Sequence, residues 1–192
     1  MNSIFANIYA RRAVREYKPD DIPEETIKEL IKAGVYAPSA LNEQPWRFVV
    51  IKNRGLMKKC SDRAKKLWLD SIRGPMNEEK EELFSLVSDP GFDIFYGARV
   101  LIFIFTRPGA DSPEFDCALA AENMMLAARS LGIGSCWVGL ASILGSDKDL
   151  MREIGAPEDH RLMSQLIFGY PTGKELPAPE RNTDVIINWI NG

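Results

Sequence analysis

The chain has 192 residues, 45% of them apolar, which is enough to bury the core of one domain. Its 24 basic and 27 acidic residues give a net charge of −3, which excludes a broadly basic surface of the kind that binds nucleic acid. The most apolar stretch, residues 100–105, is far too short to cross a membrane. Three cysteines without a CxxC pair, and a start without the pattern of a signal peptide, lead us to expect a cytoplasmic protein.

The first predicted element is a short helix over residues 4–10, which leads into a cluster of arginines. Arg11, Arg12 and Arg15 fall within five residues. A guanidinium presents a planar set of donors that matches the oxygens of a phosphate or a carboxylate. An isolated cluster of this kind is more often a solvated basic patch. Because the chain has no overall basic field, we interpret the cluster as a local anion site.

A helix is expected over residues 20–37, followed by a polar loop over residues 38–46. Two prolines make this loop rigid, and Ser39, Asn42 and Gln44 add polar side chains. An ordinary capped turn with a core tryptophan is the default interpretation of such a loop. A short buried strand is predicted over residues 48–51.

The middle of the chain alternates between regular and irregular patterns. Residues 56–72 are expected to form a helix with a basic face. Residues 74–95 fit no single pattern, and we interpret them as a mobile excursion with some helix that covers a site. A central strand over residues 100–105 precedes a long helix over residues 114–131, which is apolar on nearly every side. Such a helix is expected to pack in the core and also to meet a partner subunit.

The last third is predicted to hold a strand after Gly132-x-Gly134, a helix over residues 147–154 and a buried strand over residues 162–168. A proline-rich tail follows and carries Arg181. The tail ends in an apolar segment over residues 185–190, which needs a surface on which to dock.

Several familiar motifs are incomplete in this sequence. Gly132-x-Gly134 lacks the third glycine of a dinucleotide-binding fingerprint, and residues 169–174 are one residue short of a P-loop. One histidine, His160, is too few for a histidine-based metal site or a hydrolytic triad. Cys136 has apolar neighbours, so we expect a buried thiol there and not a nucleophile. We therefore expect no metal site and no catalytic acid or nucleophile.

Four pieces remain, and together they carry a resemblance. They are the RRxVR cluster from Arg11, the segment APSxxNxQPW from Ala37, the segment LGIGSCWVG from Leu131, and GYP from Gly169 followed by Arg181. Each piece is weak alone, but in this order, over nearly the whole length, the chain resembles the nitroreductase family of FMN-dependent oxidoreductases.

The resemblance implies a fold, an assembly and a set of cofactor-binding residues. The fold is α+β, an antiparallel sheet among helices in one domain over residues 1–192, with residues 74–95 as a lid. The assembly is a homodimer in which residues 183–191 form an arm that crosses to the partner, with FMN bound at the interface. The implied contacts are Arg11, Arg12 and Arg181 at the phosphate, Arg15 at the N1 and O2 edge of the flavin, Pro38, Ser39, Ala40 and Asn42 from the partner chain, and Trp137, Val138 and Gly139 along the isoalloxazine ring. Ala13 stands where the family usually has serine, so a hydroxyl contact is lost and the backbone N–H is left.

The same resemblance implies the reaction. NAD(P)H is the co-substrate, a small aromatic molecule such as a nitro compound or a quinone is the oxidant, and the two use one slot in a ping-pong cycle. The flavin carries the chemistry, which agrees with a sequence that offers no catalytic acid or nucleophile. Three alternatives stay open: a flavin-dependent reductive dehalogenase, a flavin-degrading enzyme, and a non-catalytic FMN-binding module.

Overall fold

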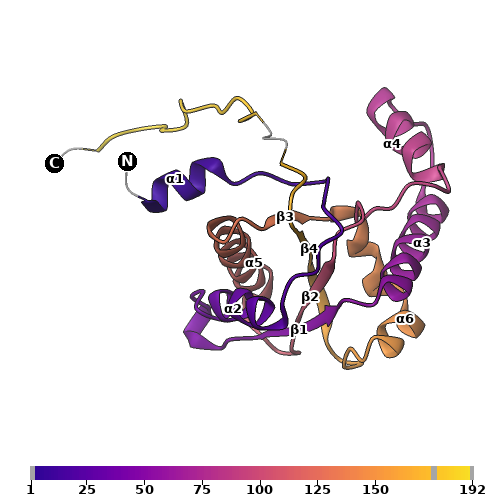
Figure 1. The fold of residues 1–192 in the computed structure, drawn as a ribbon, viewed down its shortest axis with the longest axis horizontal. Helices are drawn as coiled ribbons and strands as arrows, with labels where there is room; N and C mark the ends of the chain where they lie inside the picture. The colour runs from indigo at the N-terminus through magenta and orange to yellow at the C-terminus, as the bar shows by residue number, and fades with distance from the viewer. Residues whose placement is uncertain (1–2, 174–176, 191–192) are drawn as a thin grey trace.

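A computed structural model describes residues 3–173 and 177–190, and within them one antiparallel sheet lies among helices (Figure 1). The four strands are β1 (Trp46–Ile51), β2 (Val100–Thr106), β3 (Gly134–Trp137) and β4 (Arg161–Gly169). Their order is β1-β2-β4-β3, and every neighbouring pair is antiparallel. The α+β class predicted from the sequence is thereby confirmed.

The helices lie on both faces of this sheet. They are α1 (Ser3–Ala10), α2 (Glu24–Val35), α3 (Arg54–Ser71), α4 (Glu78–Ser88), α5 (Pro113–Ser130) and α6 (Lys148–Glu153), with 3₁₀ segments η1 (Ala40–Asn42) and η2 (Gly139–Ser146). None of the helices in the described ranges is both long and apolar enough to span a bilayer.

Strand β2 divides the core into two clusters. All seven of its residues are buried, as expected for a continuous apolar run in the middle of a sheet. Ile102 and Ile104 face the cluster built on α2 and α5, whereas Phe103 and Phe105 face the cluster that includes residues of α3 and η2. This alternation follows from the two-residue period of a strand. The strand order places β1 and β3 at the two edges of the sheet.

Four features differ most from the sequence-based expectations. The helix expected over 20–37 begins only at Glu24, after Pro23. The strand expected over 48–51 begins at Trp46, and it is a half-exposed edge strand and not a buried one. The excursion is shorter than 74–95, because Ile94 and Phe95 are fully buried in the core. It contains one helix, α4.

The fourth difference concerns the C-terminal tail. Residues 177–190 contain no helix or strand, so the strand-like end expected over 185–190 is not formed in this chain. Every residue from 177 to 190 is exposed, including Ile187 and Trp189. Figure 1 shows this segment running away from the sheet on the side of α1. Residue 191 of the predicted arm lies outside the described residues.

Candidate functional site

The arginine cluster is held against the free edge of β3. After α1 the chain runs beside this strand, where Ala13 pairs in parallel with Ser135. The Val14 N–H donates to the Ser135 carbonyl at 2.9 Å, and the Lys18 N–H donates to the Tyr170 carbonyl at 2.7 Å. Two separated hydrogen bonds fix both ends of the segment. The side chains between them therefore start from a defined backbone.

Two glycines allow this segment to approach the sheet closely. A Cβ atom at Gly134 would lie 2.8–2.9 Å from three side-chain atoms of Val14, and one at Gly169 would lie 2.6 Å from Cδ1 of Tyr17. Both distances are well below ordinary van der Waals contact. The Tyr17 hydroxyl also donates to the Val14 carbonyl at 2.5 Å, which ties the two residues together. Glycine at both positions is thus a steric requirement of the site.

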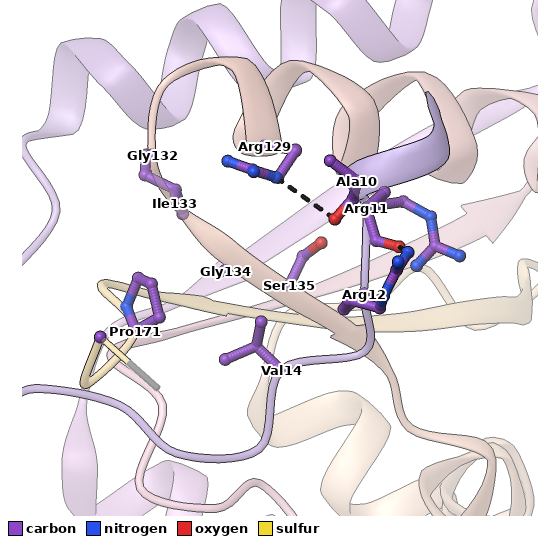
Figure 2. A pocket seen from close by; sticks show the side chains of 11 residues that line it. Ala10, Arg11, Arg12, Val14, Arg129, Gly132, Ile133, Gly134, Ser135 and Pro171 are labelled. Atoms are coloured by element: carbon purple, nitrogen blue, oxygen red, sulfur yellow. Dashed lines mark hydrogen bonds between the residues drawn. The ribbon is translucent and has the colours of Figure 1, made fainter. Parts of the chain in front are cut away.

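A pocket of about 380 Å³ opens between this segment and the turn that joins α5 to β3 (Figure 2). In Figure 2, Arg129, Arg11 and Arg12 lie along one side of the pocket, and Val14 and Pro171 lie on the other. The complete lining is Ala10, Arg11, Arg12, Val14, Arg129, Gly132, Ile133, Gly134, Ser135, Pro171 and Gly173.

The pocket carries an excess of positive charge. Arg11 forms an ion pair with Glu122 at 3.3 Å, and the Arg129 Nε donates to the Ala10 carbonyl at 3.4 Å. Nη1 of Arg12 donates to the carbonyls of Tyr9 and Arg11, at 2.7 Å each. Its Nε is buried and has no hydrogen-bond partner. The three guanidiniums that line the pocket outnumber the one carboxylate paired with them, so the pocket is suited to an anion.

Arg15 lies beyond the pocket, nearer the far end of β3. Its Cζ atom stands 5.8 Å from the centroid of the Tyr96 ring. Burial raises the pKa of the Cys136 thiol, and the charges of Arg15 and Arg11 oppose this shift without cancelling it. The expected buried thiol at Cys136 is confirmed.

The predicted ring-contacting residues follow directly after Cys136. Trp137 is 38% exposed, Val138 is buried, and Gly139 is exposed. The Val138 N–H donates to the Gln165 carbonyl at 2.9 Å, which holds the chain where it leaves β3. Trp137 is thus the last residue of the strand that lines the pocket, and Val138 and Gly139 follow it.

The loop with Pro38, Ser39, Ala40 and Asn42 lies elsewhere in the chain. It leads into β1, so β2 and β4 separate it from β3 and the arginines. Three residues of this loop have left-handed backbone torsions although none of them is glycine: Leu41 (φ 49°), Asn42 (φ 56°) and Gln44 (φ 47°). Such torsions persist only where the surroundings enforce them.

Two side chains hold this loop in its strained shape. The Ser39 hydroxyl accepts from the Gln44 N–H at 2.9 Å, and Oδ1 of Asp116 accepts from the Ala40 N–H at 3.1 Å. Asp116 is itself buried at the start of α5. These bonds fix the shape of the loop, but none of its residues lines the pocket of the same chain.

One further predicted residue lies outside the pocket, and several lining residues were not predicted. Arg181 is exposed in the tail and does not line the pocket. The lining residues that were not predicted as cofactor contacts are Ala10, Val14, Arg129, Gly132, Ile133, Gly134, Ser135, Pro171 and Gly173. Gly134 belongs to the incomplete dinucleotide fingerprint and to the segment LGIGSCWVG, neither of which indicates a steric role for it. Arg129 gave no signal, because a cation in the last turn of a helix is common.

Comparisons with known proteins agree on one family. A model of the Nitroreductase family matches residues 8–170. An Archaeoglobus fulgidus protein, named provisionally as an NADH dehydrogenase/NAD(P)H nitroreductase, is 33% identical over 171 residues, which cover 89% of this chain and 87% of that protein. An iodotyrosine deiodinase from Hydra vulgaris is 40% identical over 196 residues, covering 89% of this chain and 66% of that protein. The solved structure of a nitroreductase with bound FMN from Bacteroides fragilis has a TM-score of 0.86 and 28% identity, and covers 99% of this chain and 100% of that one.

Proposed function

The chain belongs to the nitroreductase family, and from this premise we propose that it is an FMN-dependent oxidoreductase. In the proposed reaction it takes reducing equivalents from NAD(P)H and passes them to a small aromatic oxidant, such as a nitro compound or a quinone. The observation that carries the proposal is the cationic pocket beside β3, which Arg11, Arg12 and Arg129 line. FMN ends in a phosphate, and guanidinium donors are matched to phosphate oxygens.

The phosphate would be held by Arg11, Arg12 and the backbone of Ala13. Arg11 and Arg12 already line the pocket, and Arg129 adds a third guanidinium that the sequence motif does not include. Glu122 neutralises part of this charge through its pair with Arg11. Arg181 would complete the phosphate site from the tail.

The ring of FMN, when bound, supplies the hydride chemistry, and this chain supplies binding, orientation and charge. The negative charge of a reduced flavin lies at its N1 and O2 edge, so a cation fixed there favours reduction. We assign this role to Arg15. Trp137, Val138 and Gly139 would border the ring. A Cβ at Gly139 would meet no atom within 4 Å, so that position leaves open space.

The distribution of the proposed residues supports a homodimer. The strained loop at Pro38–Asn42 and the arginines stand at opposite edges of one sheet, so a second chain is needed to unite them. Apolar side chains on α1 and the tail are exposed in one chain, among them Phe5 at 52% and Trp189 at 75%. Exposed apolar surface of this kind supports docking on a partner. We propose that the arm over residues 183–191 crosses to the other subunit.

The excursion that begins at Gly74 would form a lid over the oxidant. Its helix α4 buries only Val87, and Phe84 and Leu86 are 38% and 46% exposed. A helix with so little buried surface is suited to movement.

Reductive dehalogenation is a second candidate reaction, favoured by the likeness to the Hydra deiodinase. The lid would then choose between the two kinds of substrate.

The test is an absorption spectrum of the purified protein, taken before and after anaerobic addition of NADH or NADPH. We expect a yellow protein that releases FMN, identified by mass spectrometry, and whose visible absorbance bleaches with a nicotinamide. Colourless protein that takes up no FMN would refute the proposal, and bound FMN that neither nicotinamide reduces would indicate a binding module. Turnover of a nitroaromatic compound compared with 3-iodotyrosine then separates the two reactions.

The roles of the arginines are separated by a redox titration. Arg181→Ala should weaken FMN binding by about tenfold to a hundredfold, the scale of a charged hydrogen bond. Its midpoint potential should stay unchanged, because the phosphate has the same charge in both redox states. Arg15→Ala should lower the potential, by about 30 mV for every tenfold preferential loss of reduced flavin. Equal shifts in the two variants would mean that Arg15 belongs to the phosphate site.

A further inference from the structure

Tyr96 occupies a strained position between the excursion and β2. Its φ angle is 54°, in the left-handed region that residues with a side chain seldom adopt. Asp93 enforces this turn with three hydrogen bonds. Its Oδ1 accepts from the Phe95 N–H at 3.0 Å, its Oδ2 accepts from the Gly97 N–H at 2.9 Å, and its carbonyl accepts from the Tyr96 N–H at 2.9 Å. Strain that is held this firmly often marks a functional position.

The turn places the Tyr96 ring against Arg15. The Arg15 Cζ atom lies 5.8 Å from the ring centroid, within the range of a cation–π interaction. Phe92 supports the same ring edge to face, with centroids 5.7 Å apart and an interplanar angle of 74°. Arg15 is exposed, and within residues 3–173 and 177–190 it forms no ion pair. The ring is therefore the contact that restrains a long and otherwise solvated side chain.

The titratable groups beside Arg15 on the side of the sheet are neutral. Burial raises the pKa of Tyr17, against the opposing effect of Arg15, so this phenol stays neutral. Its hydroxyl proton is used in the bond to the Val14 carbonyl. Burial likewise raises the pKa of the Cys136 thiol. Arg15 thus has neutral neighbours on the side of the sheet and an aromatic face on the side of the excursion.

We propose that Tyr96 is a positioning residue that holds the Arg15 guanidinium at the flavin edge and thereby raises the reduction potential of the bound FMN. This inference rests on the proposed function, in which Arg15 faces N1 and O2. Tyr96 acts through Arg15 and need not touch the cofactor. Tyr96 follows the excursion that would form the lid, and the fully buried Ile94 and Phe95 separate the two.

The test compares two substitutions at this residue. Tyr96→Asn removes the ring, and asparagine tolerates a left-handed backbone, so the turn is retained. Tyr96→Phe is the matched control, because it keeps the ring and loses only the hydroxyl. The measurements are the Kd of oxidised FMN and the midpoint potential from a spectroscopic redox titration. Tyr96→Gly, which has no steric cost at this φ, provides a second variant without the ring.

Tyr96→Asn and Tyr96→Gly should weaken the binding of reduced FMN more than that of oxidised FMN. The Kd of reduced FMN divided by the Kd of oxidised FMN should rise by about twofold to fivefold, as for an exposed cation–π contact. This ratio corresponds to a potential lower by about 10–20 mV for a two-electron couple. Tyr96→Phe should match the wild type. The potential of Arg15→Ala/Tyr96→Asn should equal that of Arg15→Ala, because without Arg15 the ring has nothing to position.

Three results would overturn the inference. If Arg15→Ala lowers the potential and Tyr96→Asn leaves it unchanged, the role of Tyr96 is refuted but the assignment of Arg15 stands. The same holds if the decreases of the two single variants add up in the double variant. An unchanged potential in Arg15→Ala would overturn the assignment of Arg15 and this inference with it. Wild-type protein that binds no FMN would refute the proposed function itself, which makes the two failures distinguishable.

Discussion

Gly134→Ala tests the claim that the arginine segment approaches β3 only because no side chain intervenes. The added Cβ would stand 2.8 Å from Cγ1 of Val14 and 2.9 Å from its Cβ and Cγ2. Ordinary contact between carbon atoms begins at about 3.5 Å, so the segment must retreat by roughly 0.7 Å. The Val14 side chain is β-branched and stiff, and cannot rotate all three atoms away.

A retreat of this size also damages the hydrogen bond from the Val14 N–H to the Ser135 carbonyl, now 2.9 Å long. A bond stretched past about 3.5 Å contributes little, which costs about 0.5–1.5 kcal/mol. Overpacking in a tight site costs about 1–3 kcal/mol in all. We therefore expect a loss of about 2 kcal/mol and a melting temperature lower by about 4–8 °C. FMN affinity should fall as well, because Arg12 and the backbone of Ala13 move with the segment.

The assay is thermal unfolding together with FMN titration of Gly134→Ala, Val14→Ala and the double variant. Val14→Ala removes two of the three clashing atoms, so the double variant should lose less stability than the sum of the single losses. If Gly134→Ala melts within 1 °C of the wild type and binds FMN equally well, then glycine is not required at this position.

Three other outcomes are expected. Arg63 lowers the pKa of Asp147 through paired hydrogen bonds of 2.6 Å. The charge of Asp147 therefore stabilises the folded chain above about pH 4, and this contribution is lost at lower pH. Asp147→Asn should lower the melting temperature at pH 7, and much less at pH 3. Light scattering should give twice 21.6 kDa, and truncation before Thr183 should abolish both the dimer and FMN binding; a truncated dimer that keeps FMN would contradict a crossing arm. Exchange of residues 74–92 for another sequence should change which oxidants are reduced and leave FMN bound, whereas loss of FMN would show that the segment belongs to the cofactor site.

The regular elements were predictable because burial leaves a direct pattern in the sequence. The strand β2 is a continuous apolar run, and α5 has small and apolar residues on nearly every side. The edge strand β1 was harder, because one apolar run can be buried or half-exposed depending on what covers it. Ile94 and Phe95 were assigned to the excursion because charged and turn-forming residues precede them, although both are fully buried.

The candidate site was predictable only where its residues are adjacent in the sequence. The arginine cluster and the segment after Gly132 were identified, and the structure brings Arg11 and Arg12 to that segment in one pocket. The pairing of Ala13 with Ser135 leaves no local signal, since it depends on contacts far apart in the chain. The left-handed torsion of Leu41 is likewise unpredictable, because leucine has no preference for it.

The placement of the strained loop and the arginines at opposite edges of one sheet has a genetic consequence. If each FMN takes its arginines from one chain and its loop from the other, a dimer of two differently damaged chains keeps one intact site. A chain with Arg12→Ala and a chain with a disrupted loop at Ala40 would each be inactive alone. When they are refolded together, half of the dimers are mixed and one site in each is undamaged, so about one quarter of the wild-type sites should return. Two inactive alleles would then complement each other within one protein.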